Sequence, residues 1–151
     1  ELLKKNNQIH FVIAGDGQLK DLINTKILAN HIGSHFTIIP WVERVELLLP
    51  SLDLLVMTSQ NEGTPLILME SMLCGVLVAS TPVGGIPYLV EHEKTGYHLT
   101  KNLTQDANYL QNKIENFASE KEKIKNSAKL KIETDHSLAK LLTQTIELYN
   151  Q

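Results

Sequence analysis

The sequence has 151 residues, of which 42% are hydrophobic and 21% charged, and its formal net charge is -3. This length fits one domain with a core of its own, since domains commonly have roughly 100–200 residues. The single cysteine, Cys74, excludes a disulfide framework and argues against a cysteine-based zinc site. The mildly acidic charge lacks the basic face of a nucleic-acid-binding protein, and no apolar run reaches the roughly 18 residues of a membrane span.

The chain begins with Glu1 rather than methionine, and no signal peptide is visible. We therefore expect a piece of a longer protein.

Short apolar runs predict the strands of a parallel sheet. Each run is continuous rather than alternating, which is typical of strands buried on both faces. The runs are Ile9–Ala14, Phe36–Ile39, Asp53–Thr58 and Val76–Ser80, with Tyr97–Leu99 as a weaker fifth.

Helical spacing of apolar residues fills the intervals between these runs. The first predicted helix starts at Leu19, has its last apolar residue at Leu28 and ends near Gly33, and a short second one starts at Val45 and is ended by Pro50. A third helix is predicted over Pro65–Cys74 with Pro65 in its first turn, and a fourth near Ile86. An amphipathic helical tail is predicted from Leu103 to Tyr149, with Glu120–Lys131 as a solvated face. This alternation predicts an α/β fold with a Rossmann-like, doubly wound parallel sheet, followed by C-terminal helices. Such sheets bind ligands beyond the carboxyl ends of their strands, so the loops after the strands are the candidate sites.

The first two of these loops allow two interpretations each. Gly15 and Gly17 follow the first run and permit a tight turn close to a ligand, but the third glycine of a dinucleotide fingerprint is absent. A plain strand-to-helix turn is the alternative. Trp41 and Val42 follow the second run, where a tryptophan lines a ligand cleft or packs on the core.

The third loop carries the strongest signal. Pro65 marks a helix start, so backbone N–H groups around Gly63, Thr64 and Leu66 form a natural phosphate site. Glu62 lies just before this helix. Glu70 lies on it within an apolar stretch, where a buried carboxylate needs a partner because burying it bare costs several kcal/mol. Sugar hydroxyls would supply one.

A structural ion pair is the other interpretation of Glu70, although Arg44 is the only arginine and no lysine lies nearby in the sequence.

The fourth loop contains Gly84 and Gly85, which permit close approach of a ligand or form an ordinary glycine-rich turn. The histidines show no metal-type spacing apart from His31 and His35, which Gly33 separates, so we expect no metal site.

Taken together, these segments resemble the large family of retaining glycosyltransferases with the GT-B fold and the E-x7-E motif. The resemblance rests on an ordered set of segments: Phe11–Gly17, Ile38–Val42, Asp53–Ser59, Glu62–Gly75, Pro82–Pro87, Lys94–Gly96 and His136–Tyr149. It implies that residues 1–151 are a C-terminal nucleotide-sugar-binding domain, trimmed at its N-terminal edge, whose acceptor-binding domain is absent.

The resemblance also implies roles for single residues. Glu70 would bind the ribose hydroxyls of the donor, and Glu62 would contact the transferred sugar as the catalytic glutamate. The donor would also be bound by Gly63, Thr64, Pro65 and Leu66, with backbone N–H groups from Thr64 to Leu66 facing its sugar and phosphate, and by Gly15 and Gly17. Trp41 and Val42 would lie against the base. The donor would be a UDP- or GDP-hexose, with no cofactor and no metal.

The implied reaction is transfer of a hexose to a saccharide or lipid-linked acceptor with retained configuration, in the cytoplasm or at the cytoplasmic membrane face. The sequence departs from the family pattern at Pro40, usually glycine, and at Tyr88, usually glutamate. The phosphate-binding arginine and lysine of the family would precede Glu1, so we expect little activity from this piece alone. A GT-B nucleotide-sugar epimerase and a non-catalytic subunit of a split enzyme are the alternatives.

Overall fold

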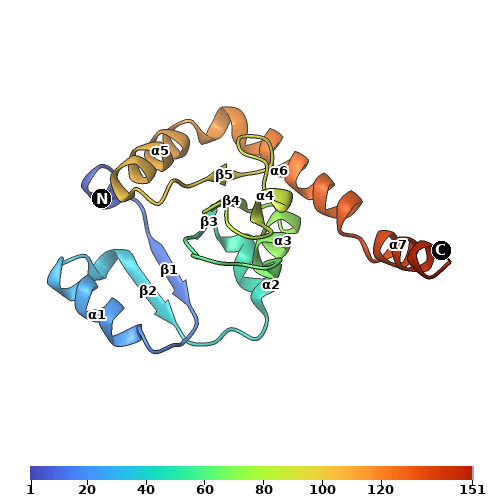
Figure 1. The fold of residues 1–151 in the computed structure, drawn as a ribbon. Coiled ribbons are helices and arrows are strands. Elements are labelled where there is room, and N and C mark those ends of the chain that lie inside the picture. The colour runs from blue at the N-terminus through green and yellow to red at the C-terminus, as the bar shows by residue number, and fades with distance from the viewer. Residues whose placement is uncertain (151) are drawn as a thin grey trace. The chain divides into compact units, whose positions relative to one another are not determined.

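The computed structural model describes residues 1–150, apart from the side chains of residues 117–119. It divides into two compact units, Glu1–Val45 and Glu46–Gln151. In agreement with the sequence, the fold is α/β with parallel strands and C-terminal helices (Figure 1).

The first unit is a strand–helix–strand element preceded by the 3₁₀ turn η1 (Leu2–Lys4). Strands β1 (Phe11–Ala14) and β2 (Phe36–Ile39) pair in parallel, with Phe11 opposite Phe36, and these two rings stack at a centroid distance of 4.9 Å. Helix α1 (Lys20–Ala29) and the 3₁₀ turn η2 (Gly33–His35) connect the strands. The helix ends earlier than predicted, because His31 adopts a left-handed φ of 54° that a helix cannot continue.

The second unit is built on a three-stranded parallel sheet in the order β3–β4–β5. These strands are β3 (Leu54–Met57), β4 (Leu77–Ser80) and β5 (Tyr97–His98), and the helices of the unit are α2 (Val45–Leu48, which starts at the last residue of the first unit), α3 (Leu66–Leu73), α4 (Ile86–Leu89), α5 (Leu103–Glu115), α6 (Phe117–Asp135) and α7 (Leu138–Tyr149). Helices α3 and α4 make the two crossovers between neighbouring strands, as a parallel sheet requires.

The short helix predicted before Pro50 is confirmed, because α2 ends at Leu48 and the chain continues into the 3₁₀ turn η3 (Leu49–Ser51), with Pro50 in its first turn, where the missing N–H is tolerated. The prediction that all strands are buried on both faces was wrong. Only β4 is buried throughout, whereas β1 alternates and leaves Val12 exposed. The first unit contains one α-helix, which cannot cover both faces of its two-stranded sheet.

Helix α3 ends where a glycine permits a left-handed turn. Gly75 has a φ of 72° and donates its N–H to the Met72 carbonyl, and the Val76 N–H bonds the Ser71 carbonyl at 2.9 Å. This pair of bonds is the Schellman arrangement that satisfies the last carbonyls of a helix. The chain therefore enters the buried strand β4 immediately after α3.

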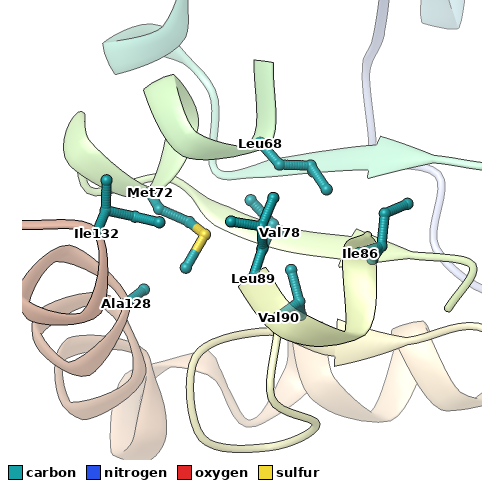
Figure 2. Packing of buried hydrophobic residues seen from close by; sticks show 8 residues of the cluster. All are labelled: Leu68, Met72, Val78, Ile86, Leu89, Val90, Ala128 and Ile132. Carbon is teal, nitrogen blue, oxygen red and sulfur yellow. The ribbon is translucent and has the colours of Figure 1, made fainter. Parts of the chain in front are cut away.

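The core of the second unit joins α3, β4, α4 and α6. Its buried members are Leu68, Met72, Val78, Ile86, Leu89, Val90, Ala128 and Ile132. Figure 2 shows Met72 directed from α3 toward Ala128 and Ile132 of α6. Helix α3, which carries one of the candidate glutamates, is thus fixed from two sides.

The interpretation of Glu120–Lys131 as a solvated face was right for only part of this segment. Within α6, Ile124 and Ala128 are almost fully buried, because they recur at the helical interval that faces the core, and Ile132 continues the same stripe. The lysines of the segment lie around this stripe, and two of them make ion pairs with other elements: Lys121 Nζ is 2.8 Å from Asp53 Oδ1, and Lys131 Nζ is 3.0 Å from Glu91 Oε1.

Lys131 links α6 to the turn before β5, and this link makes stability depend on pH. The Lys131 ammonium, followed by that of Lys94, lowers the pKa of Glu91 below its ordinary value of 4.5. A lowered carboxyl pKa gives stability that is present above the unfolded value and lost as pH falls through the folded value.

We expect Lys131→Met, which keeps the apolar stem, to lower the free energy of unfolding by about 0.5–1 kcal/mol at pH 7. The difference should shrink below about pH 4. Thermal unfolding at pH 7 and pH 3 measures this, with Lys123→Met on the same helix as the control. An equal loss at both pH values would contradict the ion-pair explanation.

Helix α7 presents an apolar face to solvent. Ser137 caps the helix by accepting the N–H of Lys140 at 3.2 Å, and no residue of α7 is buried. Its apolar side chains are 54–85% exposed: Leu138, Leu141, Leu142, Ile146, Leu148 and Tyr149. Among the described residues, no helix is long and apolar enough to cross a membrane.

Candidate active site

The strongest candidate site lies beyond the carboxyl ends of β3 and β4, where two loops follow neighbouring strands. The register pairs Met57 with Ser80, so both strands end at the same level of the sheet. The backbone N–H of Thr81 then bonds the Met57 carbonyl at 3.1 Å, and the Thr81 hydroxyl donates to the Ser59 carbonyl. Thr81 therefore fastens the start of the loop that carries Glu62.

Gly84 and Gly85 lie against the backbone of this same loop. The N–H of Gly85 donates to the carbonyl of Glu62 at 3.3 Å and to that of Gly63 at 3.0 Å. A Cβ on Gly84 would lie 1.6 Å from the Glu62 carbonyl oxygen. The close approach that the two glycines permit is therefore an approach of the protein's own backbone, which neither interpretation of the sequence had anticipated.

The two glutamates lie on different elements of one strand–loop–helix segment. Glu62 is on the loop after β3, and Glu70 is in the second turn of α3, eight residues later. Both side chains are half-buried. Within residues 1–150, leaving aside the side chains of 117–119, neither carboxylate has a hydrogen-bond or ion-pair partner.

Glu70 is half-buried rather than fully buried, and its need for a ligand as partner stays a prediction. Glu70 shares a stripe of α3 with Leu66 and Leu73, four residues before and three after it, which are 67% and 41% exposed. Burial on this helix falls on the other stripe, with Leu68 and Met72. Glu70 thus lies between two exposed leucines and is open to a ligand.

The N-terminus of α3 carries no side-chain cap. Pro65 occupies the cap position with a ψ of 108°, so the helix begins at Leu66 and Pro65 is not in its first turn as predicted. Proline has no side-chain acceptor, so no side chain of the cap residue satisfies the first N–H groups of the helix. Gly63 and Thr64, just before Pro65, are exposed. Donors and helix dipole together make this terminus suitable for an anion.

Gly15 and Gly17 lie in the first unit beside a pocket of about 210 Å³. Gly15 has a φ of 128°, a conformation that favours glycine. The N–H of Gly17 is already bonded to the Asp16 carboxylate at 2.9 Å, and this bond, together with Lys20, lowers the pKa of Asp16. The loop is therefore a self-bonded strand-to-helix turn, and a role in donor binding stays a prediction for both glycines.

Trp41 and Val42 also belong to the first unit, after β2. Trp41 is 77% exposed, so its ring is not packed into a core, whereas Val42 is half-buried. A contact of Trp41 or Val42 with the base of a nucleotide stays a prediction.

A larger pocket of about 620 Å³ lies in the second unit, between the turn before β5 and α6. It contains none of the residues predicted from the sequence, and its charges neutralise each other, since Lys131 bridges Glu91 and Asp135. Among the described residues, no group of three or more His, Cys, Asp or Glu side chains could hold a metal ion. That the reaction needs no metal remains a prediction.

Comparison with known proteins gives a family. The family model described as "Glycosyl transferases group 1" matches residues 1–132. The chain belongs to the group 1 glycosyl transferases. The N-acetyl-alpha-D-glucosaminyl L-malate synthase of Bacillus anthracis is 35% identical over 86 residues, which are 57% of this chain and 23% of the synthase.

Two solved structures are similar in fold to this group 1 chain. Anabaena Alr3699/HepE in complex with UDP has a TM-score of 0.89 at 22% identity, covering 99% of this chain and 43% of HepE. S. aureus TarM, in a complex with fondaparinux, alpha-GlcNAc-glycerol and UDP, has a TM-score of 0.89 at 24% identity, covering 99% of this chain and 31% of TarM. The chain thus spans less than half the length of each of these relatives.

Proposed function

We propose that this chain is the donor-binding part of a retaining glycosyltransferase. It would hold a nucleotide-diphosphate sugar, such as a UDP- or GDP-hexose, while the hexose passes to a saccharide or lipid-linked acceptor. The observation that carries the proposal is the segment from Glu62 to Glu70. Two half-buried carboxylates, with no partner among the residues that the structure describes, lie on either side of an uncapped helix N-terminus, at the carboxyl end of a parallel sheet.

Each part of this segment suits one part of the donor. The first N–H groups of α3 and its dipole favour the phosphates. Glu70, half-buried between the exposed Leu66 and Leu73, would accept hydrogen bonds from the ribose hydroxyls, and Glu62 from hydroxyls of the transferred sugar. An ionised carboxylate can only accept hydrogen bonds, which fits a ligand that offers hydroxyl donors.

The UDP named in the structures of HepE and TarM supports a nucleotide ligand. Trp41 and Val42 are proposed to lie against the base, and Gly15 and Gly17 to border the donor.

The remaining parts of the reaction are proposed to lie outside this chain. An acceptor-binding domain and the cations that neutralise the leaving diphosphate would come from the longer protein, so the chain alone would bind the donor with little or no transfer. We propose a cytoplasmic location, or peripheral contact with the cytoplasmic membrane face, and a reaction that needs no cofactor.

The test is titration of the chain with UDP and with GDP, in which binding is measured by calorimetry or from the NMR signals of the backbone amides. We expect one nucleotide to bind, and Glu70→Ala to weaken binding about 10-fold or more, because hydrogen bonds to a charged group contribute about 1.5–3 kcal/mol. Glu122→Ala, an exposed glutamate of α6, is the control and should bind as the parent does. Unchanged binding in Glu70→Ala would contradict the ribose role.

A further inference from the structure

We infer that Gly84 and Gly85 are positioning residues: they form a backbone lock that fixes the loop of Glu62 and thereby the site of the transferred sugar. The lock itself follows from the geometry of the second unit. Its effect on the sugar rests on the proposed function.

The contact between the two loops leaves no room for a side chain. A Cβ on Gly84 would lie 1.6 Å from the Glu62 carbonyl oxygen and 2.8 Å from its carbon, and a Cβ on Gly85 would lie 2.2 Å from the Gly63 carbonyl oxygen. These partners are backbone atoms, which cannot swing aside as the end of a side chain can. Gly84 also has a φ of 54°, which other residues rarely adopt. Glycine is therefore required at both positions because a Cβ would collide with backbone, and at Gly84 also because of its backbone conformation.

The loop that carries the two glycines is itself firmly held. It starts at the end of the fully buried strand β4 and leads directly into Ile86, which has no exposed surface and belongs to the core. Between these points the Val83 N–H bonds the Thr81 carbonyl at 2.9 Å, and the Ile86 N–H bonds the Val83 carbonyl at 3.1 Å. The loop after β4 thus provides a rigid support for the loop after β3.

The lock acts on the backbone of Glu62 and leaves its carboxylate unoccupied. The Gly85 N–H bonds the Glu62 and Gly63 carbonyls, whereas the Glu62 side chain has no partner among the described residues, side chains of 117–119 excepted. A carboxylate with no protein partner has to be positioned through its main chain. The lock holds that main chain, so its loss would misplace Glu62 while Glu70, on the separately packed helix α3, stays in position.

The test compares Gly84→Ala and Gly85→Ala with Gly75→Ala as the matched control. Gly75 has a similar left-handed φ of 72°, but nothing lies within 4 Å of its added Cβ, so this variant has backbone strain without a collision. NMR spectra of the backbone amides of the ¹⁵N-labelled chain are recorded without ligand, with UDP and with UDP-glucose. GDP and GDP-mannose replace them if the nucleotide titration selects GDP.

In the ligand-free spectra we expect Gly84→Ala and Gly85→Ala to shift the amide signals of residues 62–66, and Gly75→Ala to leave them in place. With ligands, both lock variants should lose the signal differences between UDP-glucose and UDP at residues 62–64. Their affinity for UDP should change less than about threefold, because Glu70 and α3 are intact. A purely structural role would weaken both ligands alike and overturn the inference.

Ligand-free signals of residues 62–66 that stay in place in both lock variants, or that shift as far in Gly75→Ala, would also overturn the lock. If the parent chain binds neither nucleotide, the proposed function fails, yet the ligand-free spectra still decide the lock. If neither lock variant folds, hydrogen exchange of the Gly85 amide in the parent chain decides. A strongly protected amide supports the lock, and exchange as fast as in an unstructured peptide overturns it.

Discussion

Replacing Met72 with alanine should lower the free energy of unfolding of the second unit by about 2–5 kcal/mol. Met72 has no exposed surface and packs from α3 against Ala128 and Ile132 of α6 (Figure 2). Truncation removes the transfer free energy of the side chain and leaves a cavity. Ala128 is too small to reach across such a gap, so the cavity should stay largely open and the loss should not fall at the low end of this range.

The neighbouring residue supplies a matched control. Leu73 lies on the same helix turn but is 41% exposed, so Leu73→Ala should cost under about 1 kcal/mol. Both variants are compared by urea unfolding, followed by circular dichroism. Similar losses in Met72→Ala and Leu73→Ala would contradict the assignment of the α3–α6 contact as the centre of this core.

The sequence could predict the strands and the crossover helices, because each has a local run or a helical spacing of apolar residues, whether or not it is fully buried. The run Val76–Ser80 became β4, which is buried at every position, and the run Phe36–Ile39 became β2 with the same bounds. The end of a helix can also be indicated by a local residue type. Gly75, just past the end of the α3 pattern, takes the left-handed conformation that ends a helix. Such features are local, so a single sequence contains them.

Properties that depend on contacts between distant segments could not be read in the same way. Glu70 stands among apolar residues in the sequence, yet the direction of its stripe on α3 depends on where α6 packs. The charged run Glu120–Lys131 hides Ile124 and Ala128, which face that same core. The collision that makes Gly84 indispensable involves Glu62, 22 residues earlier in the chain. A glycine pair alone does not reveal whether ligand or backbone occupies the space beside it.

In the candidate site, too, local features could be predicted from the sequence, whereas contacts between distant segments could not. Residues 59–71 could be singled out from a loop–proline–helix pattern with two carboxylates, and the structure places this segment at the carboxyl end of a parallel sheet. The support from Thr81 and Gly85 had only weak signals in the sequence: a threonine directly after a buried strand, and two glycines a few residues later. Their function as anchors depends on the register between β3 and β4, which is a tertiary property.

In the longer protein that is proposed to carry this chain, Glu62→Ala should lower sugar transfer by about 10- to 150-fold and change nucleotide affinity less than about threefold. This follows from the proposed function, because hydrogen bonds to a charged group contribute about 1.5–3 kcal/mol. If Glu62 holds the sugar and Glu70 the ribose, the two alanine variants should differ in kind. Glu70→Ala would lose nucleotide binding, whereas Glu62→Ala would lose transfer.

Steady-state transfer rates and nucleotide titrations of the same preparations separate these effects. Asn61→Ala, the adjacent exposed position of the loop, is the control and should leave both quantities near those of the parent. Glu62→Gln keeps the size of the side chain and removes its charge, so a loss as large as in Glu62→Ala would assign the effect to the carboxylate rather than to packing. Equal losses of transfer and nucleotide affinity in Glu62→Ala would show that Glu62 supports the loop rather than the sugar.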